Sequence, residues 1–401
     1  MTEINKGHYH YGITIREARN NRGMTQQELA EKWPKAEKGG GGEGVNWKYV
    51  QDIERGRKHI EDIGTLRKLC ELLDIPLWRV GLSGYDPFDL VSLPGRGRSM
   101  YNETLDVTES LIRQIWSLRC AARLDEAEKG VKRLNNLFAY FAQHLPPPVR
   151  LQRRFQLLYV QVQRLNAATA IERKHYEKAV HTYTEICESV RNLGDASATA
   201  VALKSLGKEL ERKGMKQEAV SLLEEARDVS FGASKQVMAF VHSYLARVYA
   251  SASDEFHFER AVDTGLTIAH SLDSAYDDGG DFVYAWKPIS ATLAEQSWGY
   301  LAIGAPHKTL AMRAEIGLQI LLDQDARLHT WIPLDWARAN LMLGKIEESV
   351  KEAREFYCRA KVMQSPHAIS QAYKLLKGLE NAGYGSVPVV SDFRDELTNE
   401  K

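Results

Sequence analysis

The sequence predicts an all-α protein in two parts, a small helical head followed by a long helical solenoid. Three observations predict this fold class. Apolar residues recur at helical spacing along almost the whole chain, with little that reads as a strand. The first eighty residues hold four or five short helices, and from residue 105 onward the helices come in pairs around similar turns. A composition of 44% hydrophobic and 26% charged residues in 401 is that of a folded globular chain.

The head begins with helix signals that follow one another closely. A first helix is predicted over Thr14–Asn21, and a second helix follows Thr25, where Thr25 and Glu28 have the spacing of a capping box. Asn46 is a good N-cap for a third helix with the sequence WKYVQDIE. A fourth helix, in DIGTLRKLCELLDIP, ends before Pro76. Helices two and three form a candidate helix-turn-helix.

These segments together resemble the Cro/repressor-type helix-turn-helix family, often called XRE. The resemblance rests on TQQELA at the start of the second helix, on IERG at the end of the third, and on TLRKLCELLDIP in the fourth. It implies a DNA-binding domain over residues 11–82. The sequence departs from the family at residues 34–44, where a Gly-rich loop is inserted between helices two and three. Residues 1–10 are expected to be a flexible tail.

By this resemblance, the third helix reads double-stranded DNA. Buried Val50 and Ile53 would turn Trp47, Lys48 and Asp52 toward base edges, with Gln51 nearby. Cations after the helix suit backbone phosphates. The residues expected to contact DNA are Gln26, Asn46, Trp47, Lys48, Gln51, Asp52, Arg55, Arg57 and Lys58. Residues 1–80 hold 14 Lys and Arg against 12 Asp and Glu, which is weakly basic, so use of the same fold for protein–protein recognition stays open.

The second part is expected to be a helical repeat array over residues 105–385, after a linker at 83–104 and before a tail at 386–401. Five similar turns each place a small residue just inside a second helix, and a sixth, poorer copy places Ala311 there. The small residues of the five are Ala127, Ala179, Ala219, Ala261 and Ser349. Spacings of this order indicate a helical solenoid. The third copy, LKSLGKELERKGMKQEAVSLLEEA, resembles the tetratricopeptide repeat closely; the others resemble it loosely.

A DNA-binding head joined to such an array resembles the peptide-sensing, quorum-sensing bacterial regulators of the RRNPP group. The resemblance is one of architecture. It implies a transcription regulator that works as a homodimer and holds a short signalling peptide on the concave face of its repeats.

Projecting the repeat register onto the helices predicts which side chains lie on or near that concave face. Five of the seven are basic, and we expect them to attract a peptide carboxylate or another small acidic ligand. The expected ligand-binding residues are Arg164, Lys204, Lys208, Arg247, Gln296, Tyr300 and Arg338. Two alternatives stay open: a repressor whose array only dimerises, and a protein-interaction adaptor whose head does not bind DNA.

Other classes of function find no support in the sequence. None of the phosphate-loop, nucleophile-elbow, zinc-protease or dinucleotide motifs is present, so we expect no enzyme, no cofactor and no metal site. No apolar run is long enough for a membrane span. The four cysteines lie far apart without CxxC spacing, which favours buried thiols and a cytoplasmic protein.

Overall fold

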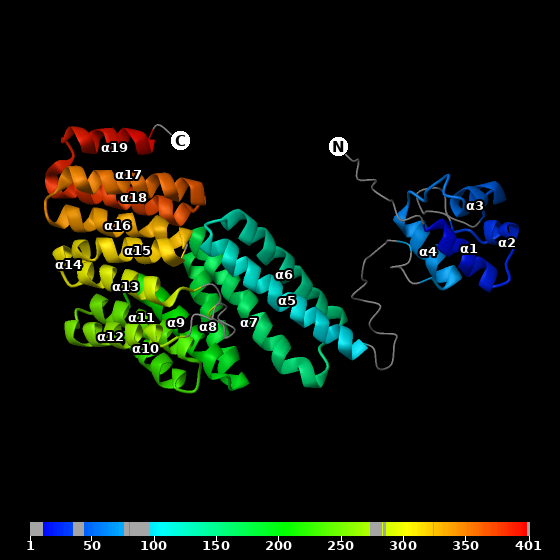
Figure 1. The fold of residues 1–401 in the computed structure, drawn as a ribbon, viewed down its shortest axis with the longest axis horizontal. Helices are drawn as coiled ribbons and strands as arrows, with labels where there is room; N and C mark the ends of the chain where they lie inside the picture. Colours follow the sequence, from blue (N-terminus) through cyan, green and yellow to red (C-terminus); the bar gives the residue numbers. More distant parts are fainter. Residues whose placement is uncertain are drawn as a thin grey trace. The chain divides into compact units, whose positions relative to one another are not determined.

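The computed structural model describes residues 11–34, 44–75, 80, 97–272, 283, 286–323 and 325–398. Within those ranges the regular elements are helices, which confirms the predicted all-α class (Figure 1). The chain divides into two compact units, Met1–Tyr101 and Asn102–Lys401. The expected flexible tail at 1–10 lies outside the described residues, as do most of the inserted loop and the first part of the expected linker.

The first unit, the head, is built from four short helices around one apolar core. They are α1 (Gly12–Asn21), α2 (Gln26–Glu31), α3 (Trp47–Glu54) and α4 (Ile63–Leu73). Thr25 and Glu28 form the predicted capping box, and Asn46 caps α3 by accepting a hydrogen bond from the Lys48 amide. The core brings together side chains from all four helices, including Ile15, Leu29, Val50, Ile53 and Leu69.

A buried ion pair fastens α1 to α3 inside this unit. Arg19 Nε lies 2.6 Å from Glu54 Oε1, and Arg19 Nη2 donates to Glu54 Oε2. The Gln26 amide on α2 also donates to Glu54 Oε2, at 2.6 Å. The inserted segment leaves and returns at one place, because the Gly44 amide donates to the Trp33 carbonyl at 2.8 Å. Helices α2 and α3 therefore pack together despite the insertion.

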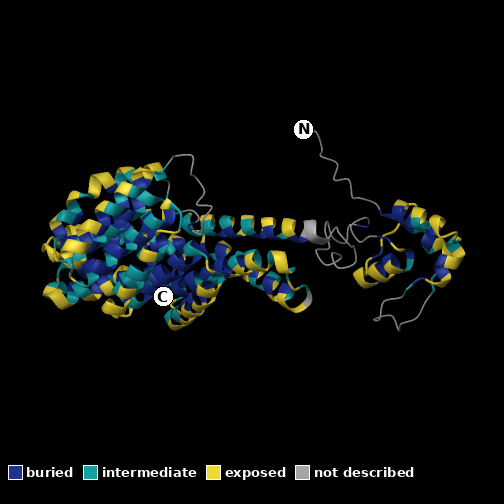
Figure 2. Cartoon of the chain, turned by 90° about the horizontal axis from the view of Figure 1, so that it is seen from below, coloured by how far each residue is buried: buried dark blue, intermediate teal, exposed yellow. Residues whose placement is uncertain are grey.

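The second unit, the array, is a succession of helices packed mainly against their neighbours in sequence. Figure 2 shows its helices buried on their inner faces and exposed on their outer ones. The helices are α5 (Gly97–Cys120), α6 (Leu124–His144), α7 (Val149–Glu172), α8 (Tyr176–Leu193), α9 (Ala196–Arg212), α10 (Lys216–Ser230), α11 (Lys235–Ser251), α12 (Glu255–His270), α13 (Pro288–Ala302), α14 (Pro306–Ala311), α15 (Arg313–Asp323), α16 (Ala326–Met342), α17 (Ile346–Met363), α18 (Pro366–Leu379) and α19 (Pro388–Thr398), with a π-helical turn at Glu380–Tyr384.

Small residues set the close packing within the helix pairs. The small residues predicted for the first five copies, four alanines and Ser349, are all buried. A Cβ at Gly207 on α9 would lie 2.5 Å from Leu223 Cδ1 on α10, so this pair needs a glycine. In the sixth copy the prediction of Ala311 is wrong, since Ala311 is exposed and Thr309 is buried. Thr309 Oγ1 donates to the Ser297 carbonyl just as Ser349 Oγ donates to the Ala337 carbonyl, twelve residues earlier in each case.

The array closes on itself, so that its last helices meet its first ones. Helix α18 packs against α7, and Leu124 at the start of α6 belongs to the same core as residues of α16 to α19. The Arg173 guanidinium donates to the Gln364 carbonyl, which joins residues 191 apart. A concave face was expected, and the contact between the ends makes the space between the inner helices a partly open cavity.

Two predictions about the linker and the C-terminal tail need correction. Helix α5 begins at Gly97, inside the expected linker 83–104, because buried Tyr101 and Leu105 give that segment an apolar face. The expected tail at 386–401 contains α19, whose Val390, Phe393 and Leu397 are buried in the core of the last repeats.

Cysteine burial is also only partly as expected. Cys70 and Cys187 are buried, Cys120 is half-buried and Cys358 is exposed. No described helix combines the length and the apolar character that a membrane crossing requires. Within the described residues, no cluster of three or more His, Cys, Asp or Glu side chains could hold a metal ion.

Candidate functional site

The structure offers two candidate sites, one in each unit, and the first is the outer face of α3 in the head. Asn46, Trp47 and Lys48 at the start of the helix are exposed, and Trp47 keeps 43% of its surface accessible. Gln51 and Asp52, one turn further, are half-buried. The N-terminal turn of α3 thus presents an aromatic ring, a cation and polar groups side by side.

A second group of cations follows α3. Arg55, Arg57 and Lys58 are all exposed. The Asp52 carboxylate lies 3.5 Å from Lys58 Nζ and 4.0 Å from an Arg57 nitrogen, which are exposed pairs worth little in stability. These cations can leave Asp52 for a phosphate at small cost.

Two of the residues expected to contact DNA serve structural roles here. The Gln26 side-chain amide is hydrogen-bonded to buried Glu54, and the Asn46 side chain caps α3. Gln26 was expected to add a donor at the surface, because it begins a helix. Its buried partner Glu54 lies 28 residues later, which no local pattern around Gln26 reveals.

The second candidate site is a cavity inside the array, with a volume of about 730 Å³. It falls within the range of about 300–1,000 Å³ that is usual for small-ligand sites. Its walls come from α5, α7, α9, α11, α13, α16 and α18, the inner helices of the closed array, together with α8. Ten basic and six acidic side chains line it, so its lining carries an excess of positive charge.

Five of the seven predicted ligand-binding residues meet in this cavity. They are Arg164, Lys204, Lys208, Arg247 and Arg338. Gln296 and Tyr300 do not line it. The Gln296 amide donates to the Tyr300 hydroxyl, and Tyr300 packs edge-on against Phe258 of α12. The cavity-facing residues of α13 are Glu295 and Trp298, so the projected register was wrong by one position on that helix, a rotation of about 100°.

Three of the five cavity cations lie close to a carboxylate of the cavity itself. Arg247 donates to Glu211 and Glu295, at 3.1 and 2.8 Å. Burial alone would lower the pKa of Arg247, but these two carboxylates raise it. Lys208 lies 3.8 Å from Glu295, and burial lowers its pKa to about 8. Arg338 lies 3.6 Å from Asp335.

Aromatic side chains form the rest of the wall, and the sequence reasoning did not find them. Phe240 and Tyr244 on α11 pack edge to face with ring centroids 5.3 Å apart, and Trp286 meets Phe240 at 4.9 Å. Trp298 stacks under the Arg247 guanidinium at 3.7 Å. Tyr244 lies three residues before Arg247 on α11, so helical spacing could have revealed it, whereas Trp298 lies on α13, where the projected register was wrong. The combination suits a ligand with both charged and apolar groups.

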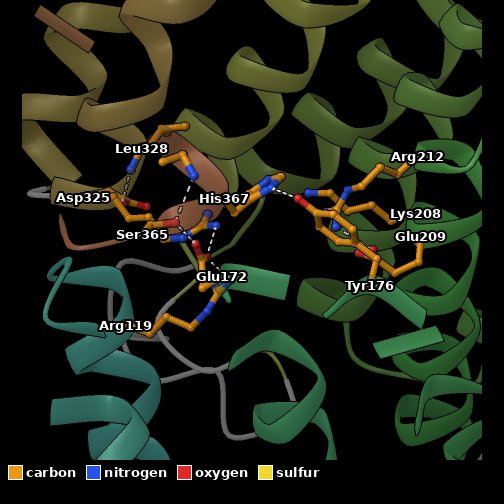
Figure 3. A network of polar contacts seen from close by, with 12 residues as sticks. Arg119, Glu172, Tyr176, Lys208, Glu209, Arg212, Asp325, Leu328, Ser365 and His367 are labelled. Atoms are coloured by element: carbon orange, nitrogen blue, oxygen red, sulfur yellow. Dashed lines mark hydrogen bonds and ion pairs between the residues drawn. The ribbon is translucent and has the colours of Figure 1, made fainter. Parts of the chain in front are cut away.

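Beside the cavity, a buried polar network joins the two ends of the array (Figure 3). Glu172, at the end of α7, accepts hydrogen bonds from Arg119 of α5, Arg327 of α16 and Ser365 before α18, at 3.0, 2.9 and 2.6 Å. Burial would raise the pKa of Glu172, but Arg327, Arg119 and the Ser365 hydroxyl outweigh it and lower the pKa to about 2. We call this group the Glu172 junction.

A second contact of the same junction region joins α8 to α18. The Tyr176 hydroxyl and His367 Nδ1 share a hydrogen bond of 2.9 Å. Burial, with the positive charge of Arg212, lowers the pKa of His367 to about 3, so the ring is neutral around pH 7. Both contacts depend on groups more than 150 residues apart in sequence, which no local pattern reveals.

Comparison with known proteins gives only weak similarity. No model of a known protein family matches the sequence, and no curated protein matches it. A Rap protein in complex with the competence and sporulation factor is similar at 11% identity and TM-score 0.44, over 74% of this chain and 97% of that one. The Rap conjugation regulator of plasmid pLS20, with the Phr* peptide, is similar at 12% identity and TM-score 0.44, over 73% of this chain and 90% of that one.

PlcR of Bacillus thuringiensis, in complex with the peptide PapR7 and DNA, is similar over 98% of this chain and 99% of its own, at 13% identity and a TM-score of 0.21. At such low values, no site residue is carried over from any of these structures.

Proposed function

We propose that the protein is a sequence-specific DNA-binding transcription regulator whose helical array binds a small ligand and joins two copies into a homodimer. The exposed face of α3 carries the proposal. Trp47 and Lys48 stand free at its N-terminal turn, and Arg55, Arg57 and Lys58 follow it. A short helix that projects from a small helical head with cations at its end suits the major groove, with the cations on phosphates.

The array supports the sensing half of this proposal. It encloses a cavity of small-ligand size, lined by charged and aromatic side chains, and the cavity touches the inner helices of almost every repeat. A ligand there would contact both ends of the closed array. It would change DNA binding only if it bound one shape of the array better than another. A short peptide with a free carboxylate has the chemistry that this lining accepts.

A homodimer follows from the small size of the head. One α3 contacts few base pairs, whereas a two-fold pair reads two half-sites about 10 bp apart or a multiple of that. Light scattering should show a particle of twice the 45.3 kDa chain mass when DNA is bound.

The experiment that tests DNA recognition is selection of bound duplexes from a random pool by the full chain, followed by affinity measurements on the selected site. Lys48→Ala should cost about 1–3 kcal/mol on that site and relax preference at one base pair. Arg57→Ala should weaken binding to all sequences alike. Failure to enrich any sequence over repeated rounds, or full affinity and unchanged preference in Lys48→Ala, would contradict the assignment of α3.

One observation favours a second candidate, a repressor whose array only dimerises. Arg247 is held between Glu211 and Glu295 within the cavity, so part of its charge already has an internal structural role. The two candidates differ in their response to small molecules. A sensor gains thermal stability from a cavity ligand, whereas a plain dimer does not.

A further inference from the structure

The cations of the cavity are not equivalent, because most of them already have a carboxylate partner. Arg247 is paired with Glu211 and Glu295, and Arg212 lies 2.7 Å from Glu209. Lys208 shares Glu295 with Arg247. A ligand that sought these cations would have to displace a buried carboxylate and leave it unpaired, which is costly. They are therefore poor anchors for an anion from outside.

Lys204 on α9 is the exception among them. Its residue surface is only 6% exposed, and it lines the cavity. No hydrogen bond and no ion pair joins its ammonium group to any other residue that the structure describes. Its Nζ instead lies 3.8 Å from the centroid of the Phe240 ring and 4.0 Å from that of Tyr244. Two ring faces compensate only part of the cost of burying a charge.

The charges around Lys204 add to the cost of burying its ammonium group. Burial is the main cause that lowers its pKa well below the usual value, and the positive charges of Lys208 on the same helix and Arg164 on α7 add to it. Glu209 on α9 and Glu295 on α13 act in the opposite direction from beyond ion-pair distance. In the empty cavity, the Lys204 ammonium therefore loses its proton more easily than an exposed lysine does. A negative group placed at the ammonium would favour the protonated form and offset the repulsion from Lys208 and Arg164.

The surroundings also limit what the negative group can be. Lys204 supplies a single positive charge, and the nearby carboxylates of Glu209 and Glu295 would repel a second negative charge. A monoanion fits better than a dianion such as a phosphate monoester. The adjoining wall is aromatic, with Tyr244 and Trp286 each in edge-to-face contact with Phe240, so the group attached to the anion should be apolar or aromatic.

We propose that Lys204 is the anion anchor of the cavity, and that it holds a single carboxylate whose apolar substituent packs on Phe240, Tyr244 and Trp286. The inference rests on the proposed ligand-binding function of the array and names the chemistry of its ligand. Because a nearby carboxylate favours the protonated ammonium, binding should raise the pKa of Lys204 and take up protons.

The test is isothermal titration calorimetry on the full chain with three probes that share a phenyl group: 3-phenylpropionate, its uncharged amide, and phenyl phosphate. The wild-type chain should bind the carboxylate more tightly than the amide or the phosphate. Two buffers of different ionisation enthalpy should reveal proton uptake with the carboxylate only. Lys204→Met should weaken carboxylate binding about 10- to 100-fold, the usual worth of a hydrogen bond to a charged group, and abolish proton uptake.

Two control variants keep the result interpretable. Lys216→Met removes an exposed lysine of α10 that does not line the cavity, and this variant should bind the carboxylate as the wild type does. Lys204→Arg keeps the charge and should retain a preference for carboxylate over amide. Circular dichroism of each variant checks that the helices are intact.

Several results would overturn the anchor. They are equal affinity for carboxylate and amide, tighter binding of phenyl phosphate, unchanged binding in Lys204→Met, or no binding of any probe by the wild type. The outcome is separate from that of the DNA selection. An anchor that fails while a specific DNA site is found leaves the regulator without this ligand chemistry, and an anchor that holds without DNA binding leaves a ligand-binding protein of another kind.

Discussion

The head and the array use cations in opposite ways. Around α3 the cations are exposed and their ion pairs are loose, as between Asp52 and Arg57 or Lys58. In the array the cavity cations are buried, and most have a partner at close range. Exposed cations bind a polyanion through many weak, salt-dependent contacts, whereas a buried cation selects one group of the right charge and size. The same residue types therefore indicate a nucleic-acid face in one unit and a small-ligand site in the other.

In each unit a buried carboxylate joins helices that are distant in sequence, Glu54 in the head and Glu172 in the array. Both accept from arginine and from a neutral side chain. The two carboxylates differ in which helices they connect. Glu54 fixes the neighbours α1, α2 and α3 of a small core, whereas Glu172 closes a long array end to end. Removing each charge should reveal this difference.

The largest effect is expected in the head. Glu54→Gln leaves the Arg19 charge buried without a counter-charge and should destabilise the head by about 3–5 kcal/mol. Hydrogen exchange measured by mass spectrometry should show faster exchange in α1 and α3, with the array unchanged. The matched control is Asp74→Asn, which breaks the exposed pair with Arg22 and should cost less than about 1 kcal/mol. Equal effects of the two variants would show that burial of the Arg19–Glu54 pair does not matter.

A loss of similar or slightly smaller size is expected at the Glu172 junction, and it should depend on pH. Glu172→Gln should lower the free energy of unfolding of the array by about 3 kcal/mol at pH 7 and increase exchange in α7 and α18. The Glu172 pKa lies at about 2 in the folded chain, below its ordinary value of 4.5. Its contribution is therefore complete above pH 4.5 and is lost as the pH falls toward 2.

Denaturant unfolding at several pH values measures this dependence. The gap between wild type and Glu172→Gln should narrow across that acidic range. Glu225→Gln, which breaks an exposed pair with Arg191, is the control and should change little at any pH. A gap that stayed constant from pH 5 to the acid limit would rule out the ionised junction.

A smaller effect is expected where two helices of a pair approach most closely. Gly207→Ala places a Cβ 2.5 Å from Leu223 Cδ1 and should destabilise the array by about 1–3 kcal/mol through overpacking of α9 against α10. Gly317→Ala on α15, where a Cβ meets nothing within 4 Å, should stabilise by about 0.5–1 kcal/mol. Thermal unfolding of both variants compares them. A Gly207→Ala chain as stable as the wild type would show that the repeat does not need a glycine there.

The sequence predicted those features of the structure that are determined by residues close together in the chain. Caps, helix faces and small residues are set within one or two turns, so Thr25, Asn46, Ala179 and Ala219 were placed correctly. The inner positions of α7, α9, α11 and α16 followed from the repeat register as well. On α13 a longer, irregular repeat shifted the register by one residue, and Gln296 was chosen instead of Glu295.

Long-range partners were beyond reach of such reasoning. The residues near Lys208 and Arg247 in the sequence do not indicate that both side chains pair with Glu295. The residues near Glu172 likewise do not indicate its hydrogen bond with Ser365. The Glu295 contacts exist because α11 packs between α9 and α13, whereas the Glu172–Ser365 contact exists because the two ends of the array meet. The tail was misjudged for the same reason, since α19 is stabilised by a core that only the folded array provides.

The central claim, that exposed cations of the head bind DNA while buried cations of the array do not, is tested most directly by the salt dependence of affinity for the selected duplex. The wild-type chain, Arg57→Ala and Lys204→Met should be compared by fluorescence anisotropy over a range of salt concentrations. Arg57→Ala should flatten the slope of log affinity against log salt by about one unit, and Lys204→Met should leave the slope unchanged. A slope that changed equally in both variants, or in Lys204→Met alone, would contradict this account.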